Sequence, residues 1–199
     1  MQEAFNKVLH NAVALFSKYG IRNVTMDDIA HELGMSKKTL YQYVENKADL
    51  VQKVLEFKLT SENLFIEQIQ AKQQNAIDEM VEIANYVHQQ LANIKPAILY
   101  ELRKYYPEIW QVFEQHRQTR VANCLTQNIE KGMKEGLYRI DIKPDILTRL
   151  YLAQAECLIS DIFFVQKNYT LPDVYAELFR YHLNGIVTDE GRAYLAKRK

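Results

Sequence analysis

Residues 25–44 read TMDDIAHELGMSKKTLYQYV, and the stretch holds two short helical patterns separated by a glycine. Thr25 is a suitable N-cap, and Asp28, three residues later, completes a capping-box pattern for the first helix. Gly34 is expected to end that helix, because glycine readily adopts the left-handed conformation found there. Ser36 is a second N-cap residue. Two short helices joined by a three-residue turn predict a helix-turn-helix.

The second of these helices is expected to have a buried side and an exposed side. Leu40 and Val44 are predicted to face inward. The exposed N-terminal end of such a helix is the part that meets base edges in the major groove of DNA. Lysine donates to guanine, threonine contacts the thymine methyl group, and glutamine bridges adenine. We therefore expect duplex DNA as a partner, with four residues facing the bases: Lys37, Lys38, Thr39 and Gln42.

Contacts to DNA phosphates are expected around these residues. The free N–H groups at a helix N-terminus suit phosphate, and Thr25 and Ser36 each precede a helix. Hydroxyl and ammonium groups nearby add contacts that position a protein on DNA without reading its sequence. The residues expected in this role are Thr25, Ser36, Tyr41, Tyr43 and Lys47.

The remainder of the chain also has helical periodicity. An apolar helical face runs from Phe5 to Tyr19 and stops at Gly20, and a helix is expected to start after Asn46 and reach about Lys72. Further helices are predicted near residues 76–93, 96–105, 107–135, 144–167 and 172–187, and the tail after Gly191 is expected to fray. No period-2 strand pattern of any length is present.

The sequence thus predicts an all-α fold with two domains. A three-helix helix-turn-helix DNA-binding domain is expected over residues 1–46. A helical ligand-binding and dimerisation domain is expected over residues 47–199. The 199 residues provide enough apolar side chains, 48% of the total, for a sizeable core.

Composition narrows the possible functions. The chain has 25 basic and 25 acidic residues, so any affinity for nucleic acid must come from local charge. Cys124 and Cys157 lack metal-ligand spacing, and we expect small buried residues in a reducing compartment, with no metal and no cofactor. There is no signal peptide and no apolar run of about 18 residues, so a cytoplasmic protein without a membrane span is expected.

Residues 12–50 resemble the DNA-binding domain of TetR-family bacterial transcriptional regulators. The most specific pieces are the pair Tyr19 and Gly20, the cap Thr25, and residues 30–34 and 40–47. Residues 132–141, with the spacing Gly-x-x-x-Gly-x-x-x-x-Asp, are similar to a segment often seen before the dimerising helices of that family. The resemblance gives the four residues above a base-facing role and gives Thr25, Tyr41, Tyr43 and Lys47 phosphate contacts.

The resemblance also implies a homodimer and a small-molecule effector. The family's last two long helices form the dimer interface, and by family habit the protein is a repressor that its effector releases from a palindromic operator. The expected interface residues are Leu150, Leu158, Ile162, Leu178 and Tyr181. The aromatic content of the C-terminal region favours a hydrophobic or aromatic effector. The expected pocket residues are Tyr86, Tyr100, Arg103, Trp110, Phe113, Tyr151 and Phe163. Ordinary core packing is the alternative for both sets.

Two other classes of function are alternatives to a regulator. A di-iron enzyme in a helical bundle needs Glu-x-x-His pairs, and none of the five histidines has a glutamate three residues before it. No phosphate-binding glycine loop or nucleophile elbow is present either, so the protein is not expected to be an enzyme. The second alternative is a helix-turn-helix protein-interaction scaffold that binds no DNA. The adjacent Lys37 and Lys38 argue against it.

Overall fold

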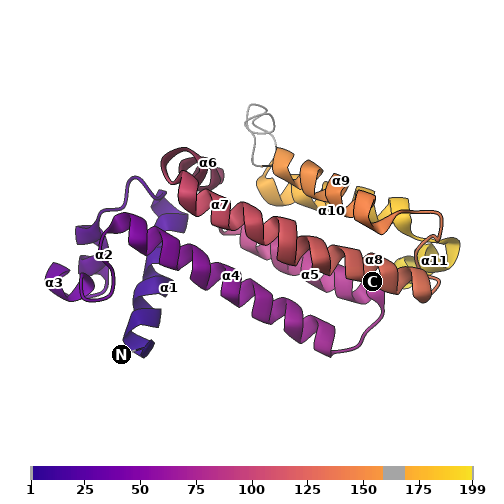
Figure 1. The fold of residues 1–199 in the computed structure, drawn as a ribbon, viewed down its shortest axis with the longest axis horizontal. Coiled ribbons are helices and arrows are strands. Elements are labelled where there is room, and N and C mark those ends of the chain that lie inside the picture. Colours follow the sequence, from indigo (N-terminus) through magenta and orange to yellow (C-terminus); the bar gives the residue numbers. More distant parts are fainter. Residues whose placement is uncertain (1, 159–168, 199) are drawn as a thin grey trace. The chain divides into compact units, whose positions relative to one another are not determined.

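The computed structural model describes residues 2–158 and 169–198, and Figure 1 shows their arrangement. The described residues form helices, with one isolated antiparallel bridge between Tyr138 and Val187, and this confirms the predicted all-α fold. In chain order the elements are α1 (Gln2–Tyr19), α2 (Met26–Glu32), α3 (Lys37–Leu40), α4 (Lys47–Ala71), α5 (Ala76–Ala92), α6 (Pro96–Tyr105), α7 (Pro107–His116), the π-helical turn η1 (Arg117–Val121), α8 (Ala122–Lys134), α9 (Pro144–Cys157), α10 (Leu171–Ile186) and α11 (Asp189–Lys197).

Several predicted boundaries need correction. The helix expected over residues 107–135 contains the π-helical turn η1, and α3 ends at Leu40 because residues 41–43 form a turn. The tail that was expected to fray forms α11, whose N-cap Thr188 accepts a hydrogen bond from the Gly191 backbone N–H. Cys157 is exposed and Cys124 half-buried, so the expectation of two buried cysteines was wrong. None of the described helices has the length and hydropathy that a membrane span requires.

The chain divides into two compact units. The first unit comprises residues 1–63 and 93–114, and the second comprises residues 64–92 and 115–199. The helices α4 and α7 therefore each begin in the first unit and end in the second. These units are not the domains expected from the sequence, because α6 and most of α7 belong to the first; the boundary at residue 46 stays a prediction.

The core of the first unit packs α1, α2, α3 and the start of α4 around fully buried aliphatic side chains, among them Ile29, Leu40 and Leu50. The caps form as the sequence predicts. Thr25 and Asp28 make a reciprocal capping box, and Ser36 Oγ accepts from the Thr39 backbone N–H. These side chains satisfy backbone donors that a helix N-terminus leaves without partners. The helix-turn-helix is thus held by local caps and by a shared apolar core.

The core of the second unit lies among α5, α8, α9 and α10 (Figure 1). At one end Tyr138 is fully buried, and its hydroxyl lies 3.2 Å from both Ala76 O and Asn128 Oδ1. The Asn128 amide donates to Ala76 O and Glu79 Oε1, and Lys131 pairs with the other Glu79 oxygen at 2.8 Å. This network satisfies buried polar groups that would otherwise destabilise the fold.

Gly132 leaves the space that the Tyr138 ring occupies. A Cβ atom at Gly132 would lie 2.1 Å from Tyr138 Cδ2. We expect Gly132→Ala to lower the free energy of unfolding by about 3 kcal/mol, because neither the helix nor the buried ring has room to move. Gly185→Ala is the control, because that helical position has open space, and it should stabilise by about 1 kcal/mol. Denaturant unfolding at one protein concentration compares them, and equal stabilities would contradict this packing.

Candidate nucleic-acid interface

The short helix α3 and the turn after it carry the residues predicted to face DNA. Lys37, Lys38 and Gln42 are exposed, whereas Leu40 and Val44 are fully or almost fully buried, as predicted. Thr39 is half-buried, and its hydroxyl lies 2.8 Å from Ser36 Oγ. Burial of one side of α3 therefore leaves two lysines and a glutamine on the solvent side, and all three side chains can donate to base edges or phosphates.

The two lysines of α3 differ in their surroundings. Lys37 Nζ donates to Asp27 Oδ2 at 3.0 Å, and this hydrogen bond raises the pKa of Lys37. Both side chains of the pair are exposed, so the interaction adds little to stability. Lys38 has no ion-pair partner among the described residues. Of the two lysines, Lys37 is thus held in an exposed ion pair by Asp27, and Lys38 is in none among the described residues.

The residues predicted to contact phosphate differ in their exposure and in their contacts with the rest of the protein. Tyr41 is exposed, whereas the half-buried Tyr43 ring stacks on Phe5 with ring centroids 5.9 Å apart. Lys47, at the first position of α4, is half-buried and donates to the backbone carbonyl of Arg22 at 3.2 Å. Burial lowers the pKa of Lys47. The hydroxyls of Thr25 and Ser36 cap their own helices.

The residues predicted to line a ligand pocket lie in several places. In the second unit, Tyr86 stacks on Phe65 with ring centroids 4.0 Å apart, and Tyr151 is buried in the core. In the first unit, Trp110 and Phe113 contact each other, with centroids 5.1 Å apart. Tyr100 and Arg103 are exposed on α6, and Phe163 lies outside the described residues.

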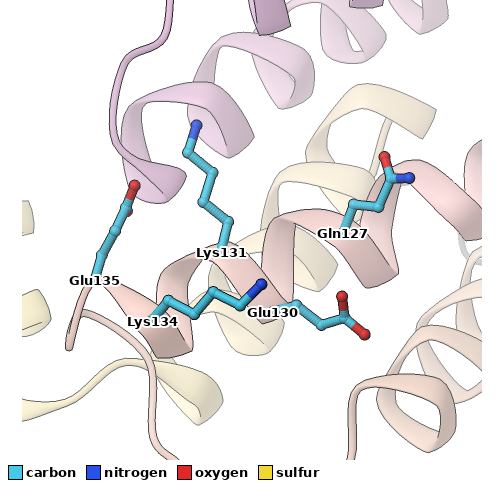
Figure 2. Close-up of a pocket in the computed structure, with 5 residues that line it drawn as sticks. All are labelled: Gln127, Glu130, Lys131, Lys134 and Glu135. Carbon is cyan, nitrogen blue, oxygen red and sulfur yellow. The ribbon is translucent and has the colours of Figure 1, made fainter.

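A surface hollow on α8 has a different character from the predicted pocket (Figure 2). Its lining is polar and comprises Gln127, Glu130, Lys131, Lys134 and Glu135. Lys131 donates to Gln74 O and Glu79 Oε2, and Glu135 accepts from the Ala76 backbone N–H at 2.7 Å. These contacts join α8 and its C-terminal end to the start of α5, so Lys131 and Glu135 have a structural role.

The residues predicted at the dimer interface differ in exposure. Leu150 on α9 and Tyr181 on α10 are 53% and 73% exposed, which leaves two large apolar side chains at the surface. Leu178 is half-buried and Leu158 is buried in the core of its own unit, so Leu158 presents little surface to a partner. Ile162 lies outside the described residues.

Sequence reasoning missed His182 on α10. This residue is 8% exposed, and its Nε2 atom has no hydrogen-bond partner in the described part of the chain. Its ring lies 4.7 Å from that of Tyr151, whose hydroxyl is 3.5 Å from the Tyr175 hydroxyl. Desolvation lowers the pKa of His182 to about 4. The signal in the sequence was a histidine among apolar residues of α10, beside Phe179, Leu183 and Ile186.

A capped helix-turn-helix with exposed lysines on its second helix defines a DNA-binding protein of the helix-turn-helix class. Residues 8–54 match the model of the family described as "Bacterial regulatory proteins, tetR family". The match covers the residues whose motif predicted a resemblance to the DNA-binding domain of tetR-family regulators, and it confirms that resemblance.

Two transcriptional regulators and one solved structure are similar to this chain over different lengths. The chain is 24% identical over 186 residues to the uncharacterized HTH-type transcriptional regulator YvaF of Bacillus subtilis, covering 92% of this chain and 96% of YvaF. It is 35% identical over 51 residues to the biofilm operon negative regulator IcaR of Staphylococcus epidermidis, which covers 26% of this chain and 28% of IcaR. A Saccharomonospora viridis regulator, solved with choline, has the same fold, with a TM-score of 0.72, 21% identity and coverage of 94% of this chain and all of its own.

The surroundings of His182 predict a stability that depends on pH. The unfolded chain binds a proton at an ordinary histidine pKa of about 6.5, whereas the folded chain binds it only near pH 4. The unfolded state therefore gains protons first as the pH falls. We expect this histidine to lower the free energy of unfolding by about 2 kcal/mol between pH 7 and pH 5.

Denaturant unfolding of His182→Leu at the two pH values tests this expectation. The variant should be less sensitive to pH than the wild type by about that amount. His88→Leu, at an exposed position of α5, is the control and should retain the wild-type difference. A His182→Leu profile that follows the wild type would show that His182 is not desolvated in the folded protein.

Proposed function

We propose that this protein is a ligand-responsive repressor that binds a palindromic DNA operator as a homodimer and is released by a small hydrophobic or aromatic effector. The observation that carries the proposal is the pair Lys37 and Lys38, exposed on α3 within a segment that matches the tetR family. An exposed helix N-terminus with two lysines supplies both base donors and charge for phosphate binding.

Binding as a dimer compensates for the weak charge of a single copy. Residues 1–58 carry eight basic and seven acidic residues, and Asp27 holds Lys37 in an ion pair. A symmetric dimer doubles the number of phosphate contacts and presents two α3 helices to sites about one DNA turn apart. The exposed Leu150 and Tyr181 support an interface formed by α9 and α10, since large apolar side chains are favoured at interfaces.

The effector site is proposed for the helical remainder of the chain. Aromatic side chains on α5 and α9, including Tyr86 and Tyr151, supply the apolar surface that small-molecule sites use. The similar Saccharomonospora viridis protein was solved with choline, which supports a small-molecule ligand as a class. Effector and operator would then weaken each other's binding by the same free energy, about 1–3 kcal/mol, through a change in α4 that alters the spacing of the two α3 helices.

Repression is favoured over activation by the similarity to IcaR, which is named as a negative regulator. That similarity covers the DNA-binding segment, so it supports the mode of DNA binding more strongly than the choice of effector. The alternative function is a helix-turn-helix that binds a protein partner and no DNA. The two functions differ in one measurable property, the affinity for duplex DNA.

Selection from a random duplex pool tests the DNA-binding proposal. We expect enrichment of a palindrome with half-sites about one turn apart, and an affinity that falls steeply with salt. Replacing Lys37 and Lys38 by Ala should weaken binding to the selected site at least about tenfold, because donors and charge are both lost. The control replaces Lys134 and Lys143, which removes the same charge from exposed positions outside the first unit.

Two results would contradict DNA binding through α3. No enriched sequence at low salt would favour the protein-interaction scaffold. Equal binding by the Lys37/Lys38 and Lys134/Lys143 double variants would show that any affinity for DNA depends on general charge. Circular dichroism of both double variants establishes that the helices remain folded, so that a loss of binding reports on the interface.

A separate measurement tests the dimer. We expect Leu150→Glu to shift the wild-type dimer towards monomer in sedimentation velocity at micromolar concentration, because a buried unpaired carboxylate is costly. Ile140→Glu is the matched control: Ile140 is 82% exposed, but it lies in the segment between α8 and α9 and on neither of the proposed interface helices α9 and α10. A dimer that tolerates Leu150→Glu, or that Ile140→Glu disrupts equally, would place the interface elsewhere.

A further inference from the structure

The turn that follows α1 is held by a carboxylate from α6. Gly20 has a positive φ of 88°, and the backbone N–H groups of Ile21 and Arg22 point to Glu101 Oε2 at 2.7 and 3.1 Å. A Cβ atom at Gly20 would lie 3.4 Å from both oxygens of the Glu101 carboxylate, so this carboxylate also packs closely against Gly20. One ionised group from far along the chain thus satisfies two consecutive donors of the turn, in charge-assisted hydrogen bonds.

Arg22 is the residue on which these contacts converge. Its guanidinium lies over the Tyr105 ring at 4.5 Å, and Nη1 donates to the Tyr105 hydroxyl at 3.0 Å. Its backbone carbonyl accepts a hydrogen bond from Lys47 Nζ at 3.2 Å. Residues of α6 therefore hold the N–H group and the side chain of Arg22, and the carbonyl of Arg22 in turn holds the ammonium group of Lys47.

We propose that Glu101 is a positioning residue for DNA binding, which sets the place of the Lys47 ammonium group through the backbone of Arg22. This inference rests on the proposed function, in which Lys47 contacts a DNA phosphate. Lys47 is half-buried at the start of α4, so its side chain has few alternative conformations. The position of its ammonium group therefore depends on the Arg22 carbonyl to which it donates a hydrogen bond. Without the carboxylate, the N–H groups of Ile21 and Arg22 lose their acceptor, the turn moves, and the carbonyl that orients Lys47 moves with it.

The sign of the expected effect separates positioning from general electrostatics. Glu101 is negatively charged, and removing a negative charge from a DNA-binding protein strengthens its attraction to DNA. Positioning of Lys47 predicts the opposite result, which is weaker binding when Glu101 is removed. Glu108, exposed on the first turn of α7 in the same unit, offers a control with the same change of charge.

The test is a double-mutant cycle on the selected operator duplex, with Glu101→Ala, Lys47→Ala and the combination of the two. We expect Glu101→Ala to weaken binding about tenfold. The plot of log affinity against log salt should become less steep by about 2, because each protomer loses one phosphate contact. In the Lys47→Ala background, the same substitution should have little further effect, whereas Glu108→Ala should bind as tightly as the wild type or more tightly.

Each other outcome overturns the inference. If Glu101→Ala binds like Glu108→Ala, the carboxylate does not position the DNA contact. If Glu101→Ala weakens binding by the same factor with and without Lys47, at an unchanged salt slope, Glu101 only stabilises the first unit. Should Glu101→Ala unfold, Glu101→Gln keeps a neutral acceptor and should give a smaller loss that still couples to Lys47. A wild-type chain that binds no DNA would refute the proposed function itself.

Discussion

The central constraint on this protein is that the second helix of its helix-turn-helix, α3, cannot be stable alone. The helix α3 has four residues, fewer than an isolated helix needs in water. It exists because Ser36 caps one end and because Leu40 is buried against α1, α2 and α4. The same burial turns Lys37 and Lys38 outward. The exposure of Lys37 and Lys38 and the stability of the motif thus have a common cause, which is the burial of the apolar side of α3.

The buried polar groups of the second unit differ in whether they have hydrogen-bond partners. Near the start of α5, the hydroxyl of Tyr138 and the amide of Asn128 share the Ala76 carbonyl, and Glu79 and Lys131 extend the network. On α10, the Nε2 atom of His182 is buried without a hydrogen bond in the described residues. The first arrangement is the usual one for protein interiors, and the second is the exception that calls for an explanation. Burial without a compensating hydrogen bond is the reason that the pKa of His182 lies below its ordinary value.

The candidate interface and the candidate pocket were predictable to different extents. Lys37, Lys38 and Gln42 could be placed because the motif is local, and periodicity with two caps is sufficient to orient its faces. The aromatic residues could be recognised as apolar but not grouped, because grouping depends on which helices become neighbours. Trp110 contacts Phe113 three residues away, whereas Tyr151 contacts His182 on another helix. The sequence also provided no indication of the π-helical turn η1, because this turn does not visibly interrupt the spacing of apolar residues along the helix.

The sequence by itself determined the fold class, the helix-turn-helix and its caps, because these follow from interactions between residues three or four positions apart. Thr25 with Asp28 and Ser36 with Thr39 are of this kind. Only the tertiary structure decided that α6 holds the turn after α1 and that Tyr138 occupies the space beside Gly132. The Ile21–Glu101 contact joins residues 80 positions apart, and its partner choice depends on the packing of whole helices. No local pattern distinguishes Glu101 from the other 24 acidic residues, since all share the same chemistry until the fold brings one of them to the turn.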